Sequence, residues 1–214
     1  PAIFDFVQHG QGNAVIEAVA GSGKSTTAIK CLDYINQNEK VLLTAFNKEI
    51  VKELSDKVGK RKHTTISTIH SIGFSILLSN YYGVINKDLK KYKYESYIRK
   101  NIYELSDYYY TKLDKKEKEK YLKNINDLVN LGRSYMCENI DDMSFIEKKY
   151  SKDLYYNEKE IALKVMEWGK SNIEYIDYGD MVWLPNVLNC KPTNSIYDWI
   201  ISRSEERRVG KECR

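Results

Sequence analysis

A glycine-rich stretch near the N-terminus has the residue types and spacing that bind phosphate groups. Residues 18–25 read Ala-Val-Ala-Gly-Ser-Gly-Lys-Ser. Backbone N–H groups of residues 21–24 can point into one concavity and bind phosphate oxygens, and the two glycines permit a close backbone approach. The Lys24 ammonium would reach the β- and γ-phosphates, and the Ser25 hydroxyl would hold Mg²⁺. The stretch therefore predicts a site for a nucleoside triphosphate with Mg²⁺.

A run of consecutive residues is expected to form this site. The predicted nucleotide-binding residues are Ala18, Val19, Ala20, Gly21, Ser22, Gly23, Lys24, Ser25 and Thr26. Among them, Lys24 and Ser25 are the predicted catalytic residues, and Ser25 is the predicted metal ligand. The first position is Ala18, where the general pattern has glycine.

The segments on either side of the loop fit the elements that must position it. Residues 13–18 are largely apolar and predict a buried strand, and residues 24–36 predict a helix with one apolar face. The positive end of that helix would point at the bound phosphates. A chance Gly-Lys-Ser in an ordinary strand–turn–helix is the alternative, which the fit of both flanking segments disfavours.

Strands alternate with helices through the N-terminal part of the chain. Further strands are predicted at residues 41–45 and 64–67 and from residue 198, and helices at residues 2–9, 48–58 and 68–78. Alternation of this kind is typical of a parallel sheet covered on both faces. The α/β class is therefore expected.

The middle of the chain has a different composition. Residues 86–176 are rich in Lys, Glu, Tyr, Asn and Asp, and they predict helices at 95–105, 115–131 and 158–173. A returning helix is predicted at residues 177–184. This organisation favours a helical insertion within the α/β domain.

Three segments in addition to the phosphate loop resemble the UvrD/Rep-like superfamily 1 DNA helicases. Residues 41–50, Val-Leu-Leu-Thr-Ala-Phe-Asn-Lys-Glu-Ile, look like motif Ia, a strand that ends in a contact with single-stranded DNA. Residues 67–71, Ser-Thr-Ile-His-Ser, look like motif Ib. Residues 177–181, Asp-Tyr-Gly-Asp-Met, are similar to the segment at which the family returns from its helical insertion. The resemblance covers nearly all of residues 2–201.

The resemblance implies a RecA-like P-loop NTPase fold in which a parallel sheet carries a helical insertion. It divides the chain into a first part of subdomain 1A (residues 1–84), subdomain 1B (85–176) and a return to 1A (177–202). The implied function is that of an ATP-dependent 3′–5′ DNA helicase or translocase that acts on single-stranded DNA and hydrolyses ATP with Mg²⁺.

The resemblance also implies a set of DNA contacts. The implied DNA-binding residues are Phe46, Asn47, Lys48, Thr68 and His70. Phe46 could stack on a base or belong to the core, since many family members carry the aromatic one position earlier. His70 could pack along its own helix, but the motif favours a place on the DNA side. Ile69 replaces the usual phenylalanine and is expected in the core.

The C-terminal segment, residues 203–214, differs abruptly from the chain before it and matches the in-frame translation of a common sequencing-library adapter. We expect a non-native tail and exclude it from the fold; a natural basic tail is the alternative. The family's second acidic motif is missing after Ser202, which predicts a fragment with weak or no hydrolytic activity. Without the tail, 29 basic and 27 acidic residues leave a net charge of +2 in place of +4. Charge alone therefore does not establish nucleic-acid binding.

Composition favours a cytoplasmic protein that does not enter a membrane. Charged residues make up 30% of the chain, no apolar run is long enough to span a bilayer, and no signal peptide is visible. The four cysteines lack a metal-ligand spacing and are expected as reduced thiols. Two other functions stay open: a small-molecule P-loop kinase, and a non-catalytic module that binds single-stranded DNA. The oligomeric state is not indicated.

Overall fold

The computed structural model describes residues 2–19, 21–86, 88–192 and 197–203. The chain divides into two compact units, which we call the sheet unit (residues 1–72 and 194–214) and the helical unit (residues 73–193). Each unit has a hydrophobic core of its own. The helical unit is longer at both ends than the insertion of residues 85–176 expected from the sequence, and the subdomain boundaries stay a prediction.

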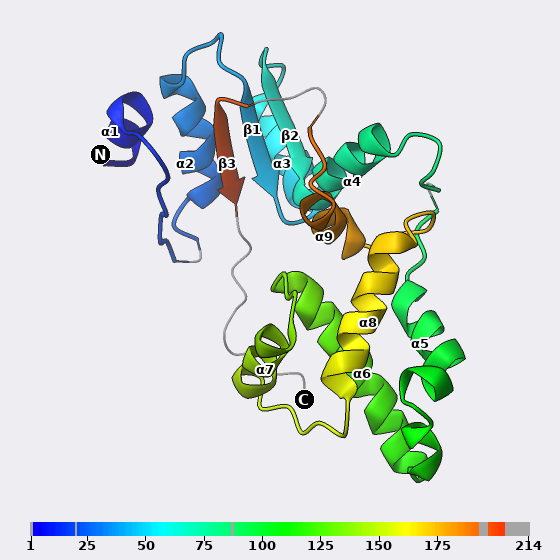
Figure 1. Ribbon diagram of the computed structural model, residues 1–214. Helices are drawn as coiled ribbons and strands as arrows, with labels where there is room; N and C mark the ends of the chain where they lie inside the picture. The colour runs from blue at the N-terminus through cyan, green and yellow to red at the C-terminus, as the bar shows by residue number, and fades with distance from the viewer. Residues whose placement is uncertain (1, 20, 87, 193–196, 204–214) are drawn as a thin grey trace. The chain divides into compact units, whose positions relative to one another are not determined.

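Within the described residues, three strands form a parallel sheet (Figure 1). The central strand β1 (Val41–Ala45) lies between β2 (Thr64–Thr68) and β3 (Trp199–Arg203). Ala45 lies opposite Thr68 on one side and Arg203 on the other, so the carboxyl ends of the strands meet at one end of the sheet. Arg203 was excluded from the fold as part of the expected tail but belongs to β3, and the rest of that tail, residues 204–214, lies outside the described residues. Every residue of β1 is buried, as in a strand covered on both faces. The α/β class and the parallel sheet are confirmed.

Helices of the sheet unit surround these strands (Figure 1). In chain order they are α1 (Ala2–His9), α2 (Lys24–Cys31), the short 3₁₀ helix η1 (Leu32–Tyr34) and α3 (Lys48–Val58). The next helix, α4 (Ile69–Asn80), begins in the sheet unit and has most of its residues in the helical unit. Ala28 and Ile29 of α2 pack against a core made by Leu43, Ala45 and Leu54. The predicted helices at residues 2–9 and 48–58 are confirmed with the same bounds.

The buried strand predicted at residues 13–18 is wrong. No residue of this segment belongs to the sheet, and the side chain of Val15 is 91% exposed. An apolar run is compatible with a strand, but a strand forms only when a neighbour completes its ladder of hydrogen bonds. The sequence of residues 13–18 does not show whether such a neighbour exists, and in the structure this segment lies outside the sheet.

The helix predicted over residues 24–36 is shorter in the structure. Regular α-helix ends at Cys31, the turn that follows is η1, and Ile35 is extended. Leu32 and Ile35 are nevertheless buried, so the predicted apolar face is preserved through the change of helix type. At the start of α4, the first helical residue is Ile69 because Thr68 completes β2 and its hydroxyl oxygen accepts from Ser71 N.

The helical unit contains the remaining helices (Figure 1). They are α5 (Lys93–Leu105), the 3₁₀ helix η2 (Tyr109–Lys112), α6 (Lys115–Ser134), α7 (Ile140–Lys149), α8 (Glu158–Ser171) and α9 (Asp180–Val187). The helices predicted at 95–105, 115–131 and 158–173 are confirmed with small shifts of their ends. The helix α7 was not predicted; its signal is a capping box in which Asn139 and Asp142 satisfy each other's backbone N–H groups.

A close approach joins α4 to α9 inside the helical unit. Pro185 lies within α9 and has no N–H to offer the carbonyl of Met181, four residues earlier. A Cβ added to Gly73 of α4 would lie 1.8 Å from that carbonyl oxygen. Only glycine therefore permits this packing. No helix among the described residues is long and apolar enough to cross a membrane.

Candidate nucleotide-binding site

The loop before α2 contains two glycines in the left-handed conformation. Gly21 has φ 76° and Gly23 has φ 84°, both in the left-handed region that side chains disfavour. A Cβ added to either glycine would meet nothing within 4 Å. Conformation, and not lack of space, therefore demands glycine at these two positions.

The N-terminus of α2 faces the loop. Gly23 is the N-cap and offers no side chain, so no side-chain hydrogen bond caps this helix end. Inside the loop, Ser22 N donates to Val19 O at 3.2 Å, and Thr27 N donates to Gly23 O at 2.9 Å. Helix N-termini of this kind bind anions through backbone N–H groups and the helix dipole. Figure 1 shows this end of α2 at the edge of the sheet toward which the strand arrows point.

The side chain of Lys24 folds back over the loop. Its Nζ donates to the carbonyl oxygens of Ala18 and Val19, at 2.9 Å in each case. The ammonium therefore lies against the first residues of the loop and brings a positive charge beside the N-terminus of α2. Phosphate oxygens could replace these two carbonyl acceptors without a change in the position of α2.

The remaining predicted residues of the loop can be placed in part. Ser25 is half-buried and Thr26 is exposed, both in the first turn of α2. The prediction for Ala20 lies outside the described residues. No group of three or more His, Cys, Asp and Glu that could hold a metal gathers in the described part of the chain. That the Ser25 hydroxyl would hold Mg²⁺ stays a prediction.

Two turns at the carboxyl end of the sheet contain residues that are expected to contact DNA. Phe46 and Lys48 follow β1, and His70 follows β2, the neighbouring strand. Phe46 is 59% exposed, which favours a surface role over a place in the core. Lys48 is exposed and His70 is half-buried.

Two of the residues expected to contact DNA also stabilise the local structure. The Asn47 side chain caps α3 by accepting from Ile50 N at 2.8 Å. Thr68 is buried, and its Oγ1 lies 2.9 Å from Ser71 Oγ and accepts from Ser71 N at 3.1 Å. These side chains fix the turns on which Phe46 and His70 lie. Whether they also contact DNA stays a prediction.

The expectation that Ile69 belongs to the core is wrong. Its side chain is 49% exposed at the start of α4. Because Ala45 and Thr68 lie side by side in the register, Ile69 and Phe46 follow neighbouring strand ends. The sequence position did indicate this exposure, because residues just after parallel strands lie at the carboxyl end of the sheet, where such sheets bind ligands.

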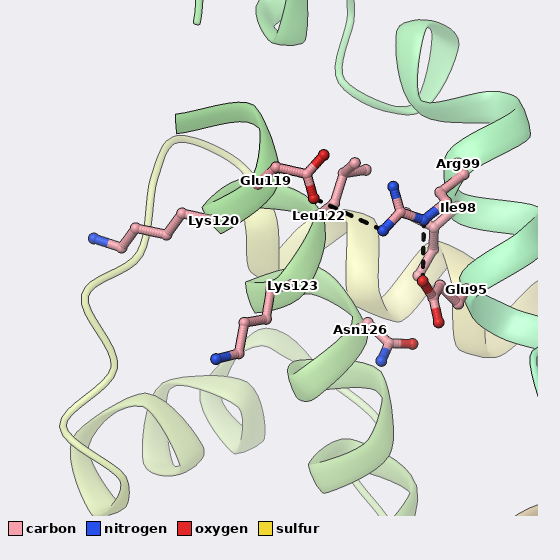
Figure 2. A pocket seen from close by; sticks show the side chains of 8 residues that line it. All are labelled: Glu95, Ile98, Arg99, Glu119, Lys120, Leu122, Lys123 and Asn126. Atoms are coloured by element: carbon pink, nitrogen blue, oxygen red, sulfur yellow. Dashed lines mark hydrogen bonds and ion pairs between the residues drawn. The ribbon is translucent and has the colours of Figure 1, made fainter. Parts of the chain in front are cut away.

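A cavity of about 560 Å³ opens in the helical unit, and it contains none of the predicted site residues (Figure 2). It is lined by Glu95, Ile98, Arg99, Glu119, Lys120, Leu122, Lys123 and Asn126. Arg99 lies 3.0 Å from Glu95 and 3.9 Å from Glu119, so its charge is already balanced by two carboxylates. The cavity therefore presents no concentrated charge that would select a ligand.

Comparison with known proteins agrees with the geometry of the loop. The family model of the UvrD/REP helicase N-terminal domain matches residues 1–203. A comparison with curated proteins gives no match. The family match supports a helicase-type role in DNA processing that depends on a nucleoside triphosphate, in a P-loop NTPase fold. The chain belongs to the UvrD/REP helicase N-terminal domain family.

Proposed function

We propose that this chain is the ATP-binding part of an ATP-dependent 3′–5′ DNA helicase or translocase that acts on single-stranded DNA in the cytoplasm. The observation that carries the proposal is the left-handed pair Gly21 and Gly23 at the uncapped N-terminus of α2, with the Lys24 ammonium beside it. ATP and Mg²⁺ are the proposed ligands. The polarity and the single-stranded substrate come from the resemblance of residues 41–50 and 67–71 to motifs Ia and Ib.

Different groups of the loop would bind different parts of the ligand. Backbone N–H groups of the loop and of the first turn of α2 would hold the phosphates, and Lys24 would offset the negative charge of the outer ones. Ser25 would orient the metal through its hydroxyl. When bound, Mg-ATP supplies a γ-phosphoryl group whose transfer to water releases the energy for movement along DNA.

Nucleotide binding is tested by removing the Lys24 ammonium. We expect Lys24→Ala to weaken the binding of a fluorescent ATP analogue with Mg²⁺ by tenfold or more, because a charge-assisted hydrogen bond contributes about 1.5–3 kcal/mol. Fluorescence anisotropy of the analogue measures this. Lys30→Ala is the matched control, since Lys30 is an exposed lysine in the last turn of the same helix. Equal affinity of Lys24→Ala and the native chain would contradict the proposed site.

DNA binding is tested at the turn after β1. We expect Phe46→Ala to weaken the binding of a labelled oligo-dT because base stacking contributes about 1–3 kcal/mol per base. Lys48→Ala should lower the slope of log affinity against log salt by about 0.7, the value for one phosphate contact on a single strand. Lys52→Ala is the control, because Lys52 is exposed on α3. Unchanged affinity and slope in both variants would place the DNA elsewhere.

A further inference from the structure

The connection between α7 and α8, residues 150–157, is fastened to α6. Lys120 of α6 forms an ion pair with Asp153, and Asp127 of α6 lies 2.7 Å from Lys152. These contacts hold a segment without regular structure against the longest helix of the unit. They are surface pairs, and each contributes little by itself.

Two residues of the same connection have a left-handed backbone conformation. Ser151 has φ 47° and Asn157 has φ 54°, and neither is glycine. Asparagine tolerates the left-handed region, but for Ser151 this conformation is unfavourable and persists only while surrounding contacts impose it. The segment will therefore open when enough of its contacts are lost.

One buried carboxyl group connects the segment to both helices. Glu158, the first residue of α8, is 1% exposed. Its Oε2 accepts from Tyr155 N of the connection at 2.9 Å and from Asn124 Nδ2 of α6 at 3.1 Å. Asn124 Nδ2 also donates to Asp153 O at 3.0 Å. The connection, α6 and α8 thus meet at Glu158.

The second oxygen of this carboxyl group has no compensation. Glu158 Oε1 is buried and has no hydrogen-bond partner within the described residues. Burial of a carboxylate with an unmatched oxygen disfavours its charged form. Burial accordingly raises the pKa of Glu158 to about 7, even though the hydrogen bonds from Tyr155 N and Asn124 and the charge of Lys120 act in the opposite direction.

The charged groups near Glu158 do not offset the cost of burying its ionised carboxyl group. Lys120 on α6 is paired with Asp153, whose charge raises the pKa of Glu158. The hydroxyl of Tyr121 on α6, a neutral group, donates to Asn157 Oδ1 at 2.6 Å. The Glu147 carboxylate on α7 pairs with Lys159. The remaining neighbour, α5, contacts the opposite half of α8, where Tyr97 stacks on Trp168.

We propose that Glu158 is a proton-controlled latch, which keeps residues 150–157 closed on α6 when its carboxyl group is neutral and releases them when it ionises. In the open state the carboxylate regains water. The left-handed backbone at Ser151 then relaxes as well. The latch does not depend on the nucleotide site and would operate in its absence.

The direction of the pH effect follows from proton linkage. An exposed glutamate has a pKa of about 4.3, so between that value and about 7 the closed state binds more protons than the open one. Opening therefore becomes more favourable as the pH rises through this window, by up to about tenfold per pH unit. Above pH 7 the dependence disappears because the carboxyl group is ionised in both states.

Hydrogen exchange of the 214-residue chain tests the latch. The Tyr155 amide is the probe, because its N–H is bonded to Glu158. After correction for the intrinsic exchange rate, we expect its opening equilibrium constant to rise by at least tenfold between pH 5 and 7 and then to level off. Glu158→Gln preserves the shape and both acceptor contacts without a charge, so its corrected exchange should be independent of pH.

Glu160→Gln is the matched control, since Glu160 is an exposed glutamate in the same turn of α8. It should keep the pH dependence of the native chain. A slope that persists in Glu158→Gln, or a flat profile in the native chain, would overturn the latch. Should Glu158→Gln not fold, the carboxyl ¹³C shift of Glu158 in the native chain decides: a midpoint near 7 supports the latch, and one near 4.3 overturns it.

Discussion

At the scale of single residues, the helical unit is organised around buried charges. Arg133 makes two bonds to the Asp177 carboxylate, at 2.7 and 3.0 Å, and a third to Asp180 at 2.9 Å. Asp180 also accepts from Lys93 at 2.8 Å and from the Tyr94 hydroxyl at 2.6 Å. Two cations and two anions therefore cancel in a largely buried cluster, in which the Asp180 side chain is fully buried. Burial lowers the pKa of Lys93, and the charge of Asp180 opposes that effect.

Loss of one charge from this cluster should be costly. Asp180→Asn leaves Lys93 and Arg133 facing one carboxylate, and breaking a buried ion pair in this way costs about 3–5 kcal/mol. Urea unfolding followed by circular dichroism measures the change in the free energy of unfolding. Asp88→Asn, at an exposed position of the same unit, should change it by less than about 0.5 kcal/mol. A small effect in Asp180→Asn would mean that the cluster relaxes or admits water.

At the scale of elements, local patterns predicted what depends on local forces. The helix α3 has the predicted bounds because its apolar spacing and the Asn47 cap lie within the same few residues. The glycines of the predicted phosphate loop lie where the backbone conformation requires them, which is a local property, and the binding of phosphate stays a prediction. The strands β1 and β2 were predicted as well, at residues 41–45 and 64–67.

The errors concern partners that are distant in sequence. The segment 13–18 has the composition of a strand but no ladder partner, and Ile69 has the chemistry of a core residue but lies at an exposed sheet edge. The cluster around Arg133 joins residues 44 and 47 positions apart, so no local pattern could predict it. The orphaned oxygen of Glu158 is likewise a property of packing, because the sequence shows only an acid at the start of a helix.

At the scale of the whole molecule, the sheet unit exposes surfaces that favour self-association. Within the described residues β3 pairs with β1 alone, and Ile200 on β3 is 66% exposed. Val15 and Val19, beside the phosphate loop in sequence, are 91% and 77% exposed. An unpaired strand edge and an exposed apolar segment are both sites at which chains associate.

We therefore expect association that increases with concentration and is weakened by Val15→Lys. Burial of one valine contributes about 1.5–3 kcal/mol, so the association constant should fall by about tenfold or more. Sedimentation velocity over a range of concentrations measures it. Val84→Lys, at a half-exposed valine of the helical unit, is the control. A purely monomeric native chain, or equal behaviour of the two variants, would contradict this expectation.

The two hydrogen bonds from Lys24 to Ala18 O and Val19 O have a consequence for discrimination among ligands. An incoming ligand has to replace both carbonyls with acceptors of its own, so its net gain depends on how far its phosphate chain extends. A monophosphate that ends short of the ammonium leaves the lysine with its original acceptors and gains little. In the proposed site, the resting lysine would thus set a minimum length for the polyphosphate, before any part of the base or sugar is recognised.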